Sequence, residues 1–234
     1  MPYIDGFVAP VPADGKDAYL EHARAAGAMF QEHGIQRTVE CWSDDVSHGT
    51  LTDFYRSVAA KDGEAVVFAW MESPSKEARD AAMTKMQGDE RMQNMPMPFD
   101  GQRMIYGGFQ PILDEGGGSG GYVDGFLVPV PDDQRDAYLA LAAKSAPIFL
   151  RNGAVRHMEA WADDVPDGKV TDFRRAVQAK EGESVVFSWV EWPDKATRDA
   201  GQQAVMTEME AIGGEMPFDG KRMIYGGFAK ILEL

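Results

Sequence analysis

An internal repeat constrains the fold of this chain more than any other feature. The segment 3–7, Tyr-Ile-Asp-Gly-Phe, returns 119 residues later as Tyr-Val-Asp-Gly-Phe at 122–126. At the same offset the segment 103–109, Arg-Met-Ile-Tyr-Gly-Gly-Phe, returns without a change at 222–228. Because the offset stays constant along the chain, its 234 residues are two copies of one unit rather than a single large domain.

A glycine-rich stretch, Asp-Glu-Gly-Gly-Gly-Ser-Gly-Gly at 114–121, separates the two copies. It offers few side chains that can pack and is typical of a flexible linker with a span on the order of 15 Å. We therefore expect one repeat over 1–113 and a second over 122–234. The stretch resembles an engineered linker, but the divergence of the two halves fits a natural tandem at least as well.

The pattern of each unit predicts the order β-α-β-β-α-β. Strands are indicated by runs rich in β-branched and aromatic residues, and helices by apolar residues at steps of three and four. In the first unit we expect strands at 3–10, 35–46, 65–72 and 103–113, with helices between Asp14 and Gly34 and between Ser73 and Gly88. The Asp-Gly at 62–63, between the apolar runs 54–60 and 65–72, predicts a hairpin.

This order is that of an α+β, ferredoxin-like unit with both helices on one face of an antiparallel sheet. The other face of the sheet must then be covered. Two tandem copies can bury their bare faces against each other, so we expect the units to pack sheet to sheet as a pseudo-dimeric α/β barrel. The expected partner of each repeat is thus the other repeat, and further homo-oligomerisation stays open.

Several motifs also resemble a known family. These are Trp-x-Asp-Asp-Val at 42–46 and 161–165, Thr-Asp-Phe at 52–54 and 171–173, and the long run that ends each unit. Together they resemble the YbaA-like family, small bacterial proteins of unknown function in the dimeric α/β-barrel superfamily. The resemblance implies the fold and the face-to-face pairing, but no settled activity. Superfamily relatives include cofactor-free monooxygenases and chlorite-handling enzymes, so the fold does not name a function.

Composition excludes several classes of function. With 23 Lys and Arg against 38 Asp and Glu, the net charge is −15, which argues against nucleic acid and anionic membranes as partners. A single cysteine, Cys41, rules out an internal disulfide and a multi-thiolate zinc site. The histidines do not recur at equivalent positions, so we expect no metal site and no cofactor, and only a one-sided site using His157 stays open. Lacking a long apolar run and a signal-like N-terminus, the chain is expected to be cytoplasmic.

Candidate site residues are the polar groups that both copies keep. Alternation along the strand at 35–46 places Glu40 and Trp42 on one face and Val39 and Cys41 on the other. We assign the small apolar pair to the helix side and Glu40 and Trp42 to the space between the sheets. A carboxylate beside an indole in a confined space has a raised pKa and can act as a base or bind a polar group. The alternative is a structural salt bridge from Glu40 to a nearby arginine.

An arginine and a tyrosine of the last strand also recur. They can hold a carboxylate or a phenolate, although local ion pairing and ring packing explain them equally well. The candidate ligand-binding residues are therefore Glu40, Trp42, Arg103, Tyr106, Glu159, Trp161, Arg222 and Tyr225. The methionine-rich stretch at 83–97 is more typical of an adaptable core or interface than of a cofactor site.

Three functions remain open from the sequence. The first is binding of a small polar or aromatic molecule between the sheets. The second is a cofactor-independent, monooxygenase-like enzyme using the same space. The third is a non-catalytic, stress-associated interaction module in which the paired sheets only complete the core. The first two require an open space between the sheets, whereas the third does not.

Overall fold

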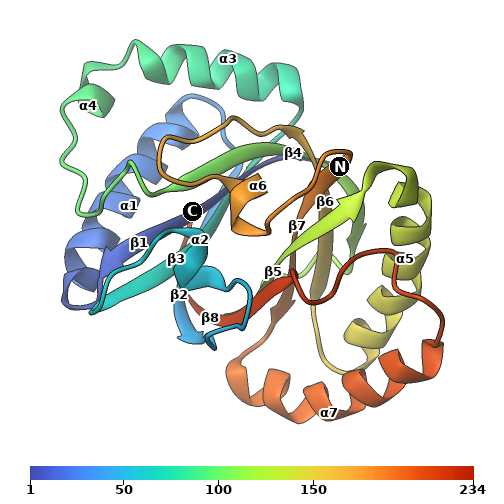
Figure 1. Ribbon diagram of the computed structural model, residues 1–234. Coiled ribbons are helices and arrows are strands. Elements are labelled where there is room, and N and C mark those ends of the chain that lie inside the picture. The colour runs from blue at the N-terminus through green and yellow to red at the C-terminus, as the bar shows by residue number, and fades with distance from the viewer.

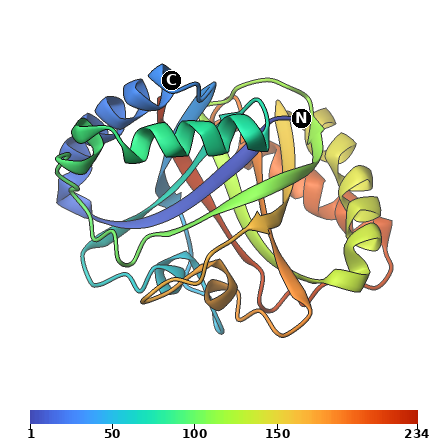
Figure 2. The same cartoon turned by 90° about the horizontal axis from the view of Figure 1, so that it is seen from above.

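The computed structural model describes residues 1–234 and shows a closed barrel of eight strands with the long helices on its outside (Figures 1 and 2). The first unit consists of β1 (Tyr3–Pro12), η1 (Ala13–Gly15), α1 (Lys16–Glu32), β2 (Arg37–Asp45), α2 (Phe54–Ser57), β3 (Glu64–Ser73), α3 (Lys76–Gln87), α4 (Glu90–Gln93) and β4 (Ile105–Glu115). The second consists of β5 (Tyr122–Pro131), η2 (Asp132–Gln134), α5 (Arg135–Arg151), β6 (Arg156–Asp164), α6 (Phe173–Ala176), β7 (Glu183–Trp192), α7 (Lys195–Ile212) and β8 (Ile224–Glu233).

The strand order around the barrel is β1-β3-β2-β8-β5-β7-β6-β4, and every neighbouring pair is antiparallel. Each unit supplies four adjacent strands with the ferredoxin-like connectivity that the sequence predicts. The units join edge to edge where β2 pairs with β8 and where β4 pairs with β6. The expected pseudo-dimeric barrel is confirmed, and the pairing at both seams leaves neither sheet with a free edge.

The hairpin expected around residues 62–63 is wrong in one respect. Residues 54–57 form the short helix α2 instead of a strand, because the Asp53 carboxylate accepts a hydrogen bond from the Arg56 amide and caps it. β2 and β3 still pair, across the connection 46–63. The recurring Thr-Asp-Phe motif thus marks a helix start. The threonine of this motif also forms a hydrogen bond between the units, because the Thr171 hydroxyl donates to the Ser57 carbonyl.

Aromatic rings from both units fill the barrel interior. Phe68 stacks on Phe187 with ring centroids 4.6 Å apart, and Trp70 stacks on Trp189 at 4.3 Å. A Cβ on Gly6 would lie 2.9 Å from the Phe187 ring, so the glycine makes room for that ring. The space between the sheets is therefore occupied, and the expected binding site between the sheets is not there.

Charged groups close one end of this interior across the unit boundary. The Arg37 guanidinium donates to Glu191 of the second unit at 2.9 Å, and the Arg156 guanidinium donates to Glu72 of the first at 2.6 Å. Glu191 is completely buried, and bidentate arginine contacts compensate its loss of hydration. Two acidic units can therefore associate because their contact is apolar inside and paired at this end.

The glycine-rich connection is shorter and better anchored than the sequence suggests. β4 extends to Glu115, so the connection between β4 and β5 is 116–121 instead of 114–121. The Gly118 amide donates to the Val155 carbonyl at 3.0 Å, and the Gly121 amide donates to the Pro193 carbonyl at 2.9 Å. The connection is thus hydrogen-bonded to the second unit.

Candidate functional site

The two faces of β2 are the reverse of the sequence-based assignment. Val39 and Cys41 lie in the barrel interior beside the aromatic rings. Glu40 and Trp42 lie on the outer face, under α1, where Trp42 packs edge-on against Tyr19 with ring centroids 6.1 Å apart. On this face α1 presents the Tyr19 hydroxyl, which donates a hydrogen bond to the Glu40 carboxylate and offsets part of its loss of hydration.

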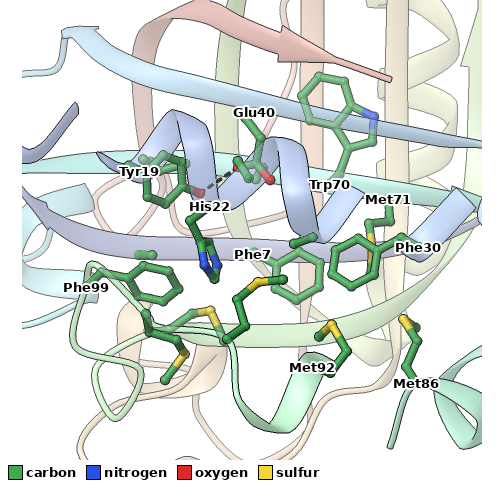
Figure 3. A pocket seen from close by; sticks show the side chains of 18 of the residues that line it. Phe7, Tyr19, His22, Phe30, Glu40, Trp70, Met71, Met86, Met92 and Phe99 are labelled. Carbon is green, nitrogen blue, oxygen red and sulfur yellow. Dashed lines mark hydrogen bonds between the residues drawn. The ribbon is translucent and has the colours of Figure 1, made fainter. Parts of the chain in front are cut away.

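A cavity of about 560 Å³ lies against this outer face in the first unit (Figure 3). Its floor is the outer face of β1 and β3, one wall is α1, and the other wall is the segment 83–104 with α3 and α4. Twenty-one residues line it and 17 of them are hydrophobic, so the space suits an apolar molecule. The aromatic walls are Phe7, Tyr19, Phe30 and Phe99.

Glu40 is the only acidic residue that lines the cavity. Its Oε2 accepts a hydrogen bond from the Tyr19 hydroxyl at 2.7 Å, drawn as the dashed line in Figure 3. Burial raises the pKa of Glu40 to about 7, and the hydrogen bond from Tyr19 opposes that rise. No arginine, lysine or histidine pairs with Glu40, so the predicted salt bridge is wrong.

His22 is the only basic residue of the lining. Its Nδ1 lies 2.9 Å from the Pro96 carbonyl and donates to it, and its ring packs edge-on against Phe99. Burial lowers the pKa of His22, which favours the neutral imidazole. The cavity thus presents one carboxyl group, one phenol, one neutral imidazole and the amides of Gln87 and Gln93 among apolar walls.

Seven methionines complete the lining, namely Met71, Met83, Met86, Met92, Met95, Met97 and Met104. The sequence marks the stretch 83–97 as an adaptable core or interface, and the structure shows it as one wall of the cavity. At the equivalent positions the second unit keeps only Met216 and Met223. This difference between the copies is the sequence signal that points to the site. Flexible thioether side chains let such a wall adapt to different shapes.

The second unit differs at every one of these polar positions except the glutamate and its tyrosine. Glu159 accepts from the Tyr138 hydroxyl at 2.7 Å, and it also contacts His157 Nε2 at 2.8 Å. Glu159 is buried. In this unit α7 is one continuous helix and packs on α5, and Asn152 at the end of α5 donates a hydrogen bond to Glu208 of α7. A cavity of about 650 Å³ in this unit is lined by Leu141, Ile212 and Phe218 among others, but not by Glu159.

The other predicted site residues lie away from the cavity. Arg103 donates to both oxygens of Glu64 at 2.7 Å and to Asp100 at 2.9 Å, so its donors serve its own unit. Tyr106 is 49% exposed on the outer face of β4. Arg222 and Tyr225 repeat these arrangements in the second unit.

Trp42 and Trp161 are packing residues beside the two tyrosines. Trp42 lies under the Lys16 ammonium, 5.3 Å from the ring centroid, and Trp161 lies under the Arg135 guanidinium at 5.4 Å. Neither indole lines one of the cavities described above. Of the eight predicted residues, Glu40 alone lines the apolar cavity.

Comparison with known proteins identifies the family of the chain. A family model described as "Protein of unknown function (DUF1428)" matches residues 2–101 and again residues 121–220. The chain belongs to this family. It carries two DUF1428 units, in agreement with the 119-residue repeat. No helix of this DUF1428 chain is long and apolar enough to cross a bilayer.

Relatives of the DUF1428 chain include the "Uncharacterized protein YbaA" of Escherichia coli K12 and of Shigella flexneri. Each is 60% identical over 114 residues, which is 48% of this chain and 97% of the relative. Among solved structures, one described as a "putative monooxygenase" of Lactobacillus acidophilus NCFM has a TM-score of 0.57 at 11% identity, over 98% of this chain and 94% of that one. An "anthrone oxidase-like protein" has a TM-score of 0.52 at 12% identity, over 100% and 92%. At these identities the likeness shows the fold alone.

Proposed function

We propose that the first unit binds a small, mainly apolar molecule in the cavity between α1, the segment 83–104 and the outer face of the sheet. The observation that carries the proposal is the ionisable carboxyl of Glu40 in a 560 Å³ space in which 17 of the 21 lining residues are hydrophobic. A volume of this size is typical of ligand sites, which combine apolar walls with a few polar groups. The second unit serves as the scaffold that completes the barrel.

Titration with the neutral dye N-phenyl-1-naphthylamine, which fluoresces in apolar surroundings, tests this proposal. We expect saturable binding of one dye per chain. Ala26 of α1 lines the cavity, and Ser145 holds the same place in the second unit. Ala26→Phe fills part of the cavity and should weaken binding at least tenfold, whereas the matched control Ser145→Phe should leave it unchanged. Absence of saturable binding, or equal losses in both variants, would show that the cavity is not the site.

A second candidate is proton abstraction by Glu40 from an aromatic substrate, in an oxidation by molecular oxygen. Two observations favour it: the pKa of about 7, which suits a general base at neutral pH, and the fold shared with proteins described as a monooxygenase and as anthrone oxidase-like. Oxygen uptake with anthrone as the substrate tests it. Uptake that Glu40→Gln abolishes and Glu159→Gln preserves would support catalysis, and uptake equal to that of the buffer would refute it for this substrate.

A further inference from the structure

The ionic partner of Glu40 is missing from the protein. Three of the four buried glutamates contact an arginine: Glu72 and Glu191 contact Arg37, and Glu183 contacts Arg222. Glu40 accepts only the neutral hydroxyl of Tyr19, on Oε2, and Oε1 receives no hydrogen bond from the protein. A carboxylate in an apolar cavity is costly unless a positive charge accompanies it. The cavity therefore has a place for a cation.

In the second unit, a histidine contacts the carboxylate that is equivalent to Glu40. There, His157 Nε2 lies 2.8 Å from Oε1 of Glu159. The first unit has Thr38 at this position, and the Thr38 hydroxyl is buried without a hydrogen-bond partner. The two copies thus keep the tyrosine–glutamate pair but differ in the group that meets the second oxygen. In the first unit that oxygen is left for a ligand.

The walls suit a cation with an apolar body. The rings of Phe7, Phe30 and Phe99 present π faces and edges, and thioethers supply polarisable contacts. No lysine or arginine lines the cavity, and the pKa of His22 is lowered, so an anionic ligand would meet Glu40 without a compensating charge. The net charge of −15 also attracts cations to the protein.

From these contacts we propose that the first unit binds an apolar primary amine as its ammonium ion. The ammonium lies at Oε1 of Glu40, and the hydrocarbon packs against the methionine wall, which is formed by the methionines of the segment 83–104. This inference rests on the proposed binding function and names its ligand class. One amine binds per chain, because His157 already contacts the corresponding oxygen in the second unit.

Binding should depend on pH through Glu40. The titratable groups around it are Tyr19 and His22 of α1 and Cys41, whose thiol faces the barrel interior. Lys16 lies over the neighbouring Trp42, and β8 places Leu232 beside Glu40. β1, β3 and the segment 83–104 present only apolar and amide side chains to the cavity. Because an ammonium ion favours the ionised carboxylate, affinity should rise about tenfold per pH unit below pH 7 and level off above it, while the amine stays protonated.

Calorimetric titration with three probes of matched shape tests the inference: 4-phenylbutylamine, 4-phenylbutan-1-ol and 4-phenylbutanoate. At pH 7.5 we expect the amine to bind at least tenfold tighter than the alcohol and the carboxylate to bind most weakly. Glu40→Gln should reduce the amine to the affinity of the alcohol, and Glu159→Gln should preserve the difference. Thr38→His, which copies the second unit, retains the carboxylate but supplies an internal partner, and it should also remove the preference for the amine.

The outcomes separate the two proposals. If the alcohol or the carboxylate binds as tightly as the amine while the naphthylamine dye still binds, the amine inference is wrong and the binding function stands. If neither the dye nor any of the three probes binds, the binding function is wrong as well. If Glu40→Gln does not fold, the Thr38→His result decides, and an undiminished preference for the amine in that variant would overturn the inference.

Discussion

The raised pKa of Glu40 makes the stability of the protein depend on pH in a direction that can be calculated. In the unfolded chain the carboxyl titrates near its ordinary value of 4.5, and in the folded protein it titrates at about 7. Between these values the folded state holds a proton that the unfolded state has released. The free energy of unfolding therefore falls as pH rises, by about 1.4 kcal/mol per pH unit. Over the whole interval the loss is about 3 kcal/mol, and above pH 7 the contribution is constant.

Urea denaturation of the wild type and of Glu40→Gln, followed by tryptophan fluorescence from pH 4.5 to 8.5, measures this effect. Other carboxyl groups titrate in both proteins, so the difference between the two free energies of unfolding isolates Glu40. The glutamine can still accept the hydrogen bond from Tyr19, which limits other changes. We expect the variant to gain about 3 kcal/mol relative to the wild type between pH 4.5 and 7. A difference that does not change with pH would refute the assignment of a half-buried carboxyl with no ionic partner at this position.

Three further perturbations test the contacts around the site and the barrel. Gly6→Ala places a methyl group 2.9 Å from the Phe187 ring and should lower the free energy of unfolding by about 1–3 kcal/mol in urea denaturation; an unchanged midpoint would contradict the packing. Arg103→Leu leaves the largely buried Glu64 without its bidentate partner and should cost about 3 kcal/mol by the same assay. The cost should be larger at pH 7 than at acidic pH, because Arg103 lowers the pKa of Glu64 and the unpaired glutamate of the variant takes up a proton more readily. Tyr19→Phe removes the hydrogen bond that lowers the pKa of Glu40, so that pKa should rise further. ¹³C NMR of the labelled carboxyl measures it, and a lower pKa would contradict the geometry.

The sequence predicts the architecture well because the repeat and the apolar patterns extend over whole strands and helices, so local exceptions do not change the result. The constant offset gives two units, and the order of strands and helices gives the pairing of their sheets. Phe54 is the instructive exception among the elements. An apolar run before an Asp-Gly looks like a strand, but the capping carboxylate of Asp53 starts a helix there.

The candidate site is harder to predict because alternation divides a strand into two faces without saying which is inside. The alternation assigns the polar face of Glu40 to the barrel interior, which stacked aromatic rings fill in the structure. Only the tertiary position of the Tyr19 hydroxyl shows that the helix side can accommodate the carboxyl. The arginine recurs in both copies because it forms the same bidentate ion pair in each, Arg103 with Glu64 and Arg222 with Glu183. Recurrence alone therefore indicates a structural role as readily as a functional one.

The methionine wall is partly predictable from the sequence and partly not. The excess of methionine in the first unit is visible in the sequence, but its meaning depends on the path of the segment 83–104. In the first unit α3 ends at Gln87 and the short α4 follows, whereas in the second unit α7 continues to Ile212. The break in the helix brings the thioethers to the cavity, and no local pattern predicts where such a chain will run.

A crystal structure of the protein grown with 4-phenylbutylamine is the most direct test that the first unit binds a small molecule at Glu40. We predict one ligand per chain in the cavity of the first unit, with its nitrogen within hydrogen-bond distance of Oε1 of Glu40 and its ring against Phe7, Phe30 or the methionine side chains. A cavity closed by those side chains, or a ligand bound only in the second unit or on the surface, would contradict it.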